Sequence, residues 1–262
     1  MTLSGKIAIV TGGARGLGHA YALHLSGLGA RVAVFDIDLE GGARYGESLD
    51  EEAQSRDAQL DKTKLDLTDQ DAVNAAVERV QRDYGRIDIL VNNAGGAIAP
   101  AERSKPSIMP AEDVRLTLDV NLMSTIYCCQ AVAPHMKRQQ SGVIVNTSSL
   151  SGRTVADDGS LAHYSMAKAA ITHFTRNLAT ELGPFGIRVN AIAPGIILTG
   201  RIKALAKERG IGTGDEVAEI PLRRLGNPED CARVIEFLAS DLSGYVTGQC
   251  ISVCGGMELS PA

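Results

Sequence analysis

A glycine-rich segment directly after a short apolar run is the feature that most limits how this chain can fold. Residues 11–18 read Thr-Gly-Gly-Ala-Arg-Gly-Leu-Gly; they follow the apolar run at 7–10, and a helical pattern begins at their end. Side chains at Gly12, Gly16 and Gly18 would block the tight turn and the close approach of a phosphate to backbone N–H groups at a helix N-terminus. The segment therefore predicts a strand, a phosphate-binding turn and a helix.

Short apolar runs alternate with helical patterns along the whole chain of 262 residues. Continuous apolar runs are typical of strands covered on both faces, and helical patterns such as 71–83 and 167–182 supply the crossovers of a parallel sheet. No linker divides the chain, so we predict one α/β domain over residues 1–262, a Rossmann-like doubly wound parallel sheet that binds a dinucleotide and carries the catalytic site. The strands are predicted at 6–11, 31–35, 64–67, 87–92, 143–147, 188–193 and 250–253.

Two irregular stretches follow predicted strand ends, where ligands bind in open α/β sheets. Residues 95–110 contain three prolines, and residues 196–221 mix glycines with apolar side chains. We expect both to shape a substrate site, and the second to close over it as a lid. The alternative for the second stretch is a permanently packed helical excursion, because 201–209 fits an amphipathic helix.

Composition excludes several functional classes. The formal net charge is −5, basic residues are scattered among acidic ones, and no stretch approaches the ~18 apolar residues of a membrane helix. We therefore expect a soluble protein with neither a nucleic-acid nor a membrane partner.

The five cysteines form an odd set without Cys-x-x-Cys spacing, and the first residues lack the apolar core of a signal peptide. Both features favour the cytoplasm. Cys250 and Cys254 could be read as a metal pair, but no further ligands stand at suitable spacing nearby. We interpret them as small apolar fillers and predict no metal site.

Asp36 ends the second predicted strand, about 20 residues beyond the glycine-rich turn. A carboxylate at this place can accept hydrogen bonds from an adenosine ribose and would repel a 2′-phosphate, which favours NAD over NADP. Arg15 in the turn could offset part of that repulsion. The alternative is a solvated acid at a strand end.

A second group of residues suggests proton transfer. Tyr164 and Lys168 are four positions apart, so both project from one face if their segment is helical. A nearby ammonium favours the phenolate and so lowers the pKa of the tyrosine. Ser149 follows a predicted strand, where its hydroxyl could hydrogen-bond a substrate oxygen. The alternatives are an exposed helical pair and, because Ser148 and Ser151 adjoin it, a turn-forming serine.

The chain resembles short-chain dehydrogenases/reductases of the single-domain, NAD-type branch along nearly its whole length. Besides the glycine-rich turn and the Tyr-x-x-x-Lys pair, the matching motifs are Asp66-Leu67, Asn92-Asn93-Ala94-Gly95, Asn121 in Asp-Val-Asn-Leu, Asn146-Thr147-Ser148-Ser149, Arg188-Val189-Asn190, and Pro194-Gly195 followed by Thr199.

The resemblance implies a catalytic role for four residues. Tyr164 would be the general acid/base, and Lys168 would hold the nicotinamide ribose and lower the tyrosine pKa. Ser149 would orient the substrate, and Asn121 would position a water in a proton relay. The resemblance also implies a homotetramer, assembled through the helices that hold Asn121 and Tyr164.

The resemblance further implies a cofactor-binding set. Asp66 and Leu67 would contact adenine, Asn93 would pack by the adenine ribose, and Ile197 with Thr199 would meet the carboxamide end of nicotinamide. The whole implied set is Gly12, Arg15, Gly16, Leu17, Gly18, Asp36, Asp66, Leu67, Asn93, Ala94, Gly95, Tyr164, Lys168, Pro194, Gly195, Ile197 and Thr199.

These features predict an oxidoreductase that interconverts a secondary alcohol and a ketone, both small molecules, by hydride transfer with NAD(H). The alternatives are an NADP-dependent ketoreductase, such as a 3-oxoacyl-acyl-carrier-protein reductase, and a catalytically silent dinucleotide sensor. The intact set of catalytic residues argues against the sensor.

Three departures from the family pattern keep the resemblance from naming a substrate. Ser149 and Tyr164 are 15 positions apart, about two more than usual; the 95–110 loop is a few residues longer; and Cys254 stands where aspartate is usual. Next to Tyr164, His163 hints at a polar substrate such as a polyol or sugar derivative, as do Asp157 and Asp158.

Overall fold

The computed structural model describes residues 2–209 and 214–259. Seven parallel strands form one sheet in the order β3-β2-β1-β4-β5-β6-β7. The direction of progression reverses between β1 and β4, which is the switch point where open α/β sheets bind ligands. The strands are β1 (Ile7–Thr11), β2 (Arg31–Asp36), β3 (Leu60–Lys64), β4 (Ile89–Asn92), β5 (Gly142–Thr147), β6 (Ile187–Pro194) and β7 (Cys250–Val253).

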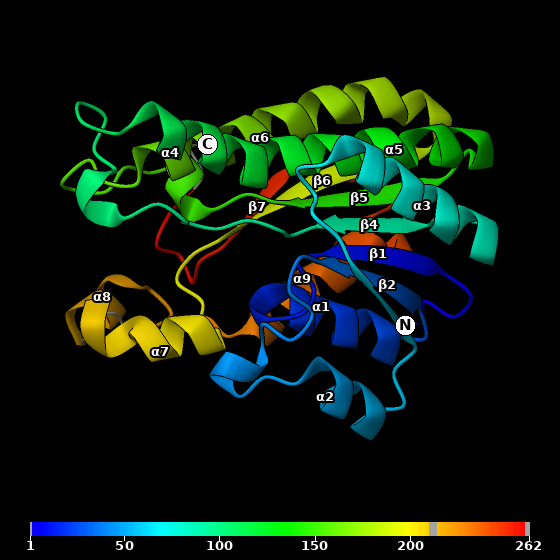
Figure 1. Cartoon of the computed structure of the whole chain (residues 1–262), viewed down its shortest axis with the longest axis horizontal. Coiled ribbons are helices and arrows are strands. Elements are labelled where there is room, and N and C mark those ends of the chain that lie inside the picture. The colour runs from blue at the N-terminus through cyan, green and yellow to red at the C-terminus, as the bar shows by residue number, and fades with distance from the viewer. Residues whose placement is uncertain (1, 210–213, 260–262) are drawn as a thin grey trace.

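Helices cover both faces of the sheet (Figure 1). In this view α3, α5 and α6 lie above the sheet, α1, α2 and α9 lie below it, and α7 with α8 lies beyond one end of the strands. The α-helices are α1 (Gly16–Gly27), α2 (Leu49–Ser55), α3 (Gln70–Tyr84), α4 (Ala111–Leu118), α5 (Ser124–Gln139), α6 (Ala162–Leu182), α7 (Gly200–Arg209), α8 (Gly214–Glu219) and α9 (Pro228–Ala239). Short turns of other helix types are η1 (Ala43–Tyr45), η2 (Ala101–Arg103), η3 (Asp119–Met123), η4 (Leu150–Gly152), η5 (Gly183–Phe185) and η6 (Asp241–Ser243).

Each face of the sheet has its own hydrophobic core. Side chains alternate along β1, so Ala8 and Val10 join a cluster with residues of α1 and α9, whereas Ile7 and Ile9 join a cluster with residues of α3 and α5. The continuous apolar runs of the sequence therefore correspond to strands buried on both sides. The predicted doubly wound α/β fold is confirmed.

The strand predicted at 64–67 is wrong, because β3 spans Leu60–Lys64 instead. This strand is at the edge of the sheet, and its Leu-Asp-Lys-Thr-Lys sequence is partly exposed throughout, so it has no apolar run to reveal it. The buried Leu65 and Leu67 follow the strand. The other strands lie within two residues of their predicted bounds.

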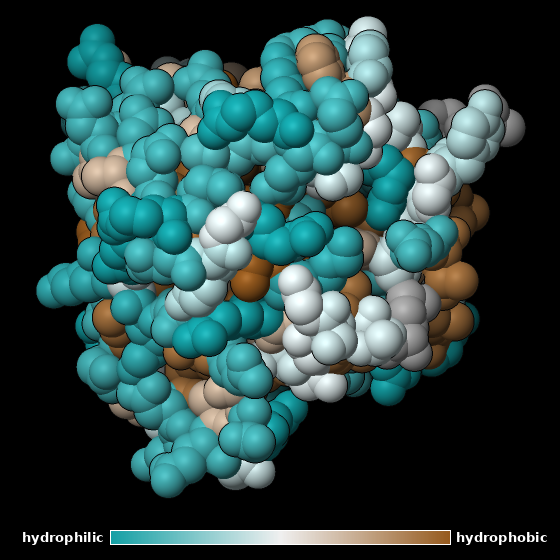
Figure 2. Space-filling model, turned by 90° about the vertical axis from the view of Figure 1, so that its right-hand side faces the viewer, coloured by the Kyte–Doolittle hydropathy of each residue, from teal (hydrophilic) through white to brown (hydrophobic). Residues whose placement is uncertain are grey.

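The face of the molecule at the amino ends of the strands is largely polar. Figure 2 shows the face at the amino ends of the strands, where hydrophilic side chains cover most of the area. Within residues 2–209 and 214–259, no helix has the length and apolarity needed to span a bilayer.

Candidate active site

The glycine-rich turn between β1 and α1 is packed so tightly that side chains do not fit. Gly12 has a φ of +61°, and a Cβ there would lie 2.8 Å from Ala94 Cα. A Cβ on Gly18 would overlap the Gly12 carbonyl oxygen. The turn therefore presents bare backbone at the carboxyl end of the sheet, at the start of α1.

The turn is fastened to the end of β4. The Thr11 hydroxyl accepts hydrogen bonds from the N–H groups of Asn93 (3.0 Å) and Ala94 (3.1 Å). The Asn93 amide in turn donates to the Gly12 carbonyl at 3.0 Å. Asn93, which the family resemblance implied would pack by the adenine ribose, thus also holds the glycine-rich turn in place.

Asp36 lies against the same turn at the end of β2. Its carboxylate is buried and accepts hydrogen bonds from the Ala14 and Asp38 N–H groups, each at 3.0 Å. These two bonds leave lone pairs for further donors. Arg44 lies nearby and pairs with Asp38 at 2.6 Å.

The remaining residues of the predicted adenine side lie at the start of α1 and after β3. Arg15 is the extended N-cap residue of α1, and Leu17 lies in its first turn. Asp66 and Leu67 follow β3; Leu67 is buried, whereas Asp66 accepts from the Thr68 N–H and hydroxyl groups.

Glu47 also lies at this end of the sheet, although the sequence analysis did not single it out. Its carboxylate accepts hydrogen bonds from the Gly16 N–H at 2.7 Å and from the Gly200 N–H at 2.9 Å. One side chain therefore joins the glycine-rich turn to the first residue of α7. The contact also shows that the N–H groups of the turn suit an anion.

The stretch predicted as a lid begins at β6 and crosses toward the turn. Gly195 follows β6, and a Cβ there would lie 2.9 Å from Cys254 Cβ. Ile197 is buried, and Thr199 Oγ1 accepts from the Ile202 N–H at the start of α7. A Cβ on Gly16 would lie 3.5 Å from the Thr199 side chain. The stretch 196–221 contains α7 and α8, and its residues 210–213 lie outside the described ones.

Asn121 holds the backbone after β4. Its Oδ1 accepts from the Gly96 N–H at 2.9 Å, and its Nδ2 donates to the Gly96 carbonyl at 3.2 Å. Gly95 has a φ of +133°, and a Cβ on it would overlap Asn121 Oδ1. Asn121 lies in η3, a π-helical turn between α4 and α5; such turns occur frequently at functional sites.

Tyr164 and Lys168 lie one turn apart on α6. Lys168 Nζ lies 5.7 Å from the centre of the Tyr164 ring and donates to the Thr147 carbonyl at 2.9 Å. The Ser149 hydroxyl lies close enough to the Tyr164 phenol to lower its pKa, and η3, which holds Asn121, packs against α6. The structure brings these side chains together at the carboxyl end of β5.

The net pKa shift of Tyr164 is opposite to the sequence expectation. Burial raises the pKa of the phenol, and this outweighs the lowering by the Ser149 hydrogen bond and by the positive charge of Arg201. Burial also lowers the pKa of Lys168 to about 8. The expected lowering by Lys168 is therefore not seen in the net shift, because desolvation disfavours the charged form of both groups.

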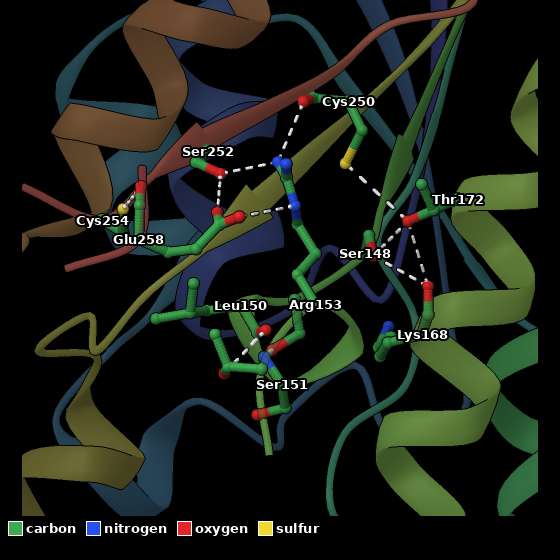
Figure 3. Close-up of polar contacts among 12 residues, drawn as sticks. Ser148, Leu150, Ser151, Arg153, Lys168, Thr172, Cys250, Ser252, Cys254 and Glu258 are labelled. Carbon is green, nitrogen blue, oxygen red and sulfur yellow. Dashed lines mark hydrogen bonds and ion pairs between the residues drawn. The ribbon is translucent and has the colours of Figure 1, made fainter. Parts of the chain in front are cut away.

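The segment that carries Ser149 is tied to the last strand (Figure 3). Arg153 follows η4, and its Nη1 donates to Ser252 Oγ at 2.8 Å and to the Cys250 carbonyl at 3.3 Å. Its Nε lies 3.1 Å from Glu258 Oε1, and Ser252 Oγ donates to Glu258 Oε2 at 2.7 Å. This network holds η4 against β7.

The structure bears on two hints from the sequence. His163 is fully buried, whereas Asp157 and Asp158 are exposed, so the hint of a polar substrate stays a prediction. Cys250 Sγ contacts Thr172 Oγ1 at 3.7 Å, and Cys254 Sγ donates to the Glu258 carbonyl at 3.6 Å. In the part of the chain that the structure describes, no three His, Cys, Asp or Glu side chains are grouped to hold a metal ion.

Comparison with known proteins identifies the family. The family described as "Enoyl-(Acyl carrier protein) reductase" matches residues 12–258. The chain belongs to the short-chain dehydrogenase/reductase family. The glycine-rich turn from Gly12 onward and the Tyr164 cluster lie within the matched range.

Three members of this family illustrate the similarity. Cyclohexanol dehydrogenase of Rhodococcus sp. (strain TK6) is 44% identical over 268 residues, which cover 99% of this chain and 98% of that protein. A 3-oxoacyl-acyl-carrier-protein reductase of Thermotoga maritima is 39% identical over 263 residues, covering 99% and 100%. A solved 7α-hydroxysteroid dehydrogenase, complexed with NADH and 7-oxo glycochenodeoxycholic acid, superposes with a TM-score of 0.85 at 35% identity and covers 99% of this chain and 97% of that one.

Proposed function

We propose that this short-chain dehydrogenase/reductase interconverts a secondary alcohol and a ketone with NAD(H), and that Tyr164 moves the proton. The observation that carries the proposal is the convergence of three side chains: the Lys168 ammonium lies 5.7 Å from the centre of the Tyr164 ring, one helical turn away, and the Ser149 hydroxyl is close enough to the phenol to lower its pKa. The names of the similar proteins, among them a cyclohexanol dehydrogenase and a hydroxysteroid dehydrogenase, support the same reaction class.

The residues at the carboxyl end of β1 and β2 fit a nicotinamide dinucleotide. Gly12 and Gly18 leave no room for side chains, so a phosphate can reach the backbone, and the Gly16 N–H already binds a carboxylate. The buried Asp36 carboxylate would accept the ribose hydroxyls. When bound, the dinucleotide supplies the acceptor for the hydride that leaves the alcohol carbon.

The chain's own residues would handle the substrate oxygen. Ser149 donates a hydrogen bond to that oxygen and holds it beside Tyr164. The Tyr164 phenolate takes the hydroxyl proton during oxidation, and the phenol returns it during ketone reduction. The Lys168 ammonium favours the phenolate while it stays charged, which its pKa of about 8 allows up to mildly alkaline pH.

A substrate panel tests the proposed function. Purified protein with NAD is offered cyclohexanol, sterols, sugar alcohols and other secondary alcohols, and NADH formation is followed by absorbance. We expect turnover of at least one secondary alcohol and loss of nearly all turnover in Tyr164→Phe. Turnover confined to a 3-oxoacyl thioester with NADPH would instead support the reductase alternative.

NAD is expected to be preferred over NADP by at least tenfold in kcat/KM, about 1.4 kcal/mol, because a 2′-phosphate would meet the Asp36 carboxylate. Arg44, a candidate partner for that phosphate, is already paired with Asp38. Steady-state rates with both cofactors measure the ratio, and Asp36→Asn should reduce it. A kcat/KM that favours NADP would contradict the prediction and would assign Arg15 and Arg44 to the phosphate.

The 196–221 stretch is expected to act as a lid that cofactor and substrate order. The Glu47 carboxylate joins the Gly16 N–H of the glycine-rich turn to the Gly200 N–H at the start of α7. Cofactor binding at the turn can therefore change the position of α7. Amide hydrogen exchange with and without NAD and a ketone should show selective slowing in this stretch. Equal protection in both states would favour the permanently packed helical excursion.

We also propose a cytoplasmic homotetramer that assembles through α6, which holds Tyr164, and through the segment of α4, η3 and α5 that holds Asn121. Met166 on α6 is 45% exposed and Leu116 on α4 is 51% exposed, which gives this side apolar surface to bury. All five cysteines are free, as a reducing compartment would keep them. Light scattering would measure the mass of the assembly.

A further inference from the structure

Arg201 reaches from α7 across the site to the loop after β4. Its Nη2 donates to the Ala97 carbonyl at 3.3 Å, and a Cβ on Gly96 would lie 3.7 Å from its Nη1. A guanidinium has five N–H donors in a rigid plane, so one bond to a fixed acceptor limits where its charge can lie.

The acceptor is itself fixed. Gly96, the residue before Ala97, has a φ of +147° and exchanges two hydrogen bonds with the Asn121 side chain. Asn121 is fully buried and also donates to the Thr117 carbonyl at 3.0 Å. Arg201 is therefore anchored on backbone that belongs to the candidate catalytic cluster.

The positive charge that Tyr164 receives from its own helix and from the adjoining β5–η4 segment changes with pH. Lys168 is the cation one turn from Tyr164 on α6, whereas Arg176 lies further along the helix. The pKa of Lys168, about 8, means that it loses charge as the pH rises through the range where a phenolate forms. His163, adjacent in sequence, is fully buried. Ser149 contributes an uncharged hydroxyl.

Among the described residues, the charge from another element that acts on Tyr164 is that of Arg201. From η3, Asn121 presents an uncharged amide, and on α4 the buried Asp113 carboxylate is paired with Arg103 at 2.8 Å. From α7, the positive charge of Arg201 acts on Tyr164 and lowers its pKa. A guanidinium keeps its charge at any pH used to assay such an enzyme.

We propose that Arg201 is a positioning residue that holds the start of α7 on the Ala97 carbonyl and thereby keeps a permanent positive charge near the Tyr164 phenol. This inference rests on the proposed function of Tyr164 as acid/base. The docking of α7 on the loop after β4 and the activation of the tyrosine are then coupled, because the same side chain performs both.

The test compares three variants with wild type. Arg201→Met removes the charge and keeps the length, Arg201→Lys keeps a charge, and Lys203→Met removes an exposed charge two residues along α7. The pH profile of kcat/KM is measured for alcohol oxidation and for ketone reduction. Phenolate absorbance is titrated in parallel, with Tyr164→Phe subtracted, and this readout does not depend on turnover.

Removing the charge should raise the pKa of Tyr164, so the rising limb of alcohol oxidation moves to higher pH in Arg201→Met. At neutral pH we expect kcat/KM for oxidation about threefold to tenfold below that of Lys203→Met, since one pH unit on this limb is tenfold. The loss should shrink at alkaline pH, ketone reduction should lose less, and Arg201→Lys should restore most of the profile.

Three results would overturn the proposal. One is an equal loss in both directions at every pH, which would mean a purely structural role; another is identical behaviour of Arg201→Lys and Arg201→Met. The third is a phenolate titration unchanged by Arg201→Met. If wild type and Lys203→Met turn over no alcohol at all, the proposed function fails, and the phenolate titration still decides the role of Arg201.

Discussion

Tyr164→Phe is expected to lower kcat for alcohol oxidation at least about 100-fold, because general acid/base catalysis contributes roughly 10²- to 10⁴-fold. The ring remains to pack on α6, so NADH affinity should stay close to that of wild type. Burial raises the pKa of Tyr164, so wild-type oxidation should increase with pH as the phenolate forms. The residual rate of the variant should lack this increase.

The control is Tyr245→Phe, which removes the same hydroxyl from a fully exposed tyrosine. It should match wild type in kcat and in its pH profile. Stopped-flow turnover and NADH fluorescence titration provide the two measurements. If Tyr164→Phe kept more than about a tenth of the wild-type kcat, the proton would have to be assigned to another group.

Gly18→Ala is expected to destabilise the fold by about 1–3 kcal/mol, because its methyl group would overlap the Gly12 carbonyl oxygen and the turn must shift. The same shift should weaken NAD binding roughly tenfold or more, about 1.4 kcal/mol. Chemical denaturation and NADH titration measure the two effects.

Gly27→Ala is the matched control, because it makes the same change in the same helix. A Cβ there meets nothing within 4 Å, so the helix should gain about 0.5–1 kcal/mol from the lower entropy cost of alanine. Opposite signs for the two variants would attribute the loss to the turn. Equal stability and equal NAD affinity of both would contradict the packing argument.

Local motifs predicted the parts of the molecule whose causes are local. Three features can be recognised from a few consecutive residues. The turn needs glycines where backbone must stay bare, the buried strands need continuous apolar runs, and the Tyr164–Lys168 pair needs a spacing of four to share one helical face. The edge strand β3 carries no such demand and was misplaced. The burial of His163 could not be predicted either. It is adjacent to Tyr164 on α6, but adjacent residues of a helix point in different directions, so His163 is buried while Tyr164 is partly exposed.

The contacts that complete the candidate site could not be predicted because they join distant segments. Glu47 binds backbone 31 and 153 residues away, and Arg201 binds a carbonyl 104 residues away. A lone acid in a loop and an arginine after a glycine carry no signal of such partners. The direction of the Tyr164 pKa shift was missed for a related reason, since it depends on how deeply the fold buries the phenol.

Because η4 is held by β7, the last strand, the segment that carries Ser149 can be secured only near the end of translation. The partners of Arg153, which are Cys250, Ser252 and Glu258, are translated about 100 residues after it. At about 5–20 residues per second, the ribosome therefore adds Ser252 and Glu258 roughly 5–20 s after the segment that they hold. A nascent chain can already contain the glycine-rich turn and α6 while the segment that carries Ser149 is not yet held by β7. We therefore expect prematurely ended chains to lack turnover even where they retain much of the sheet.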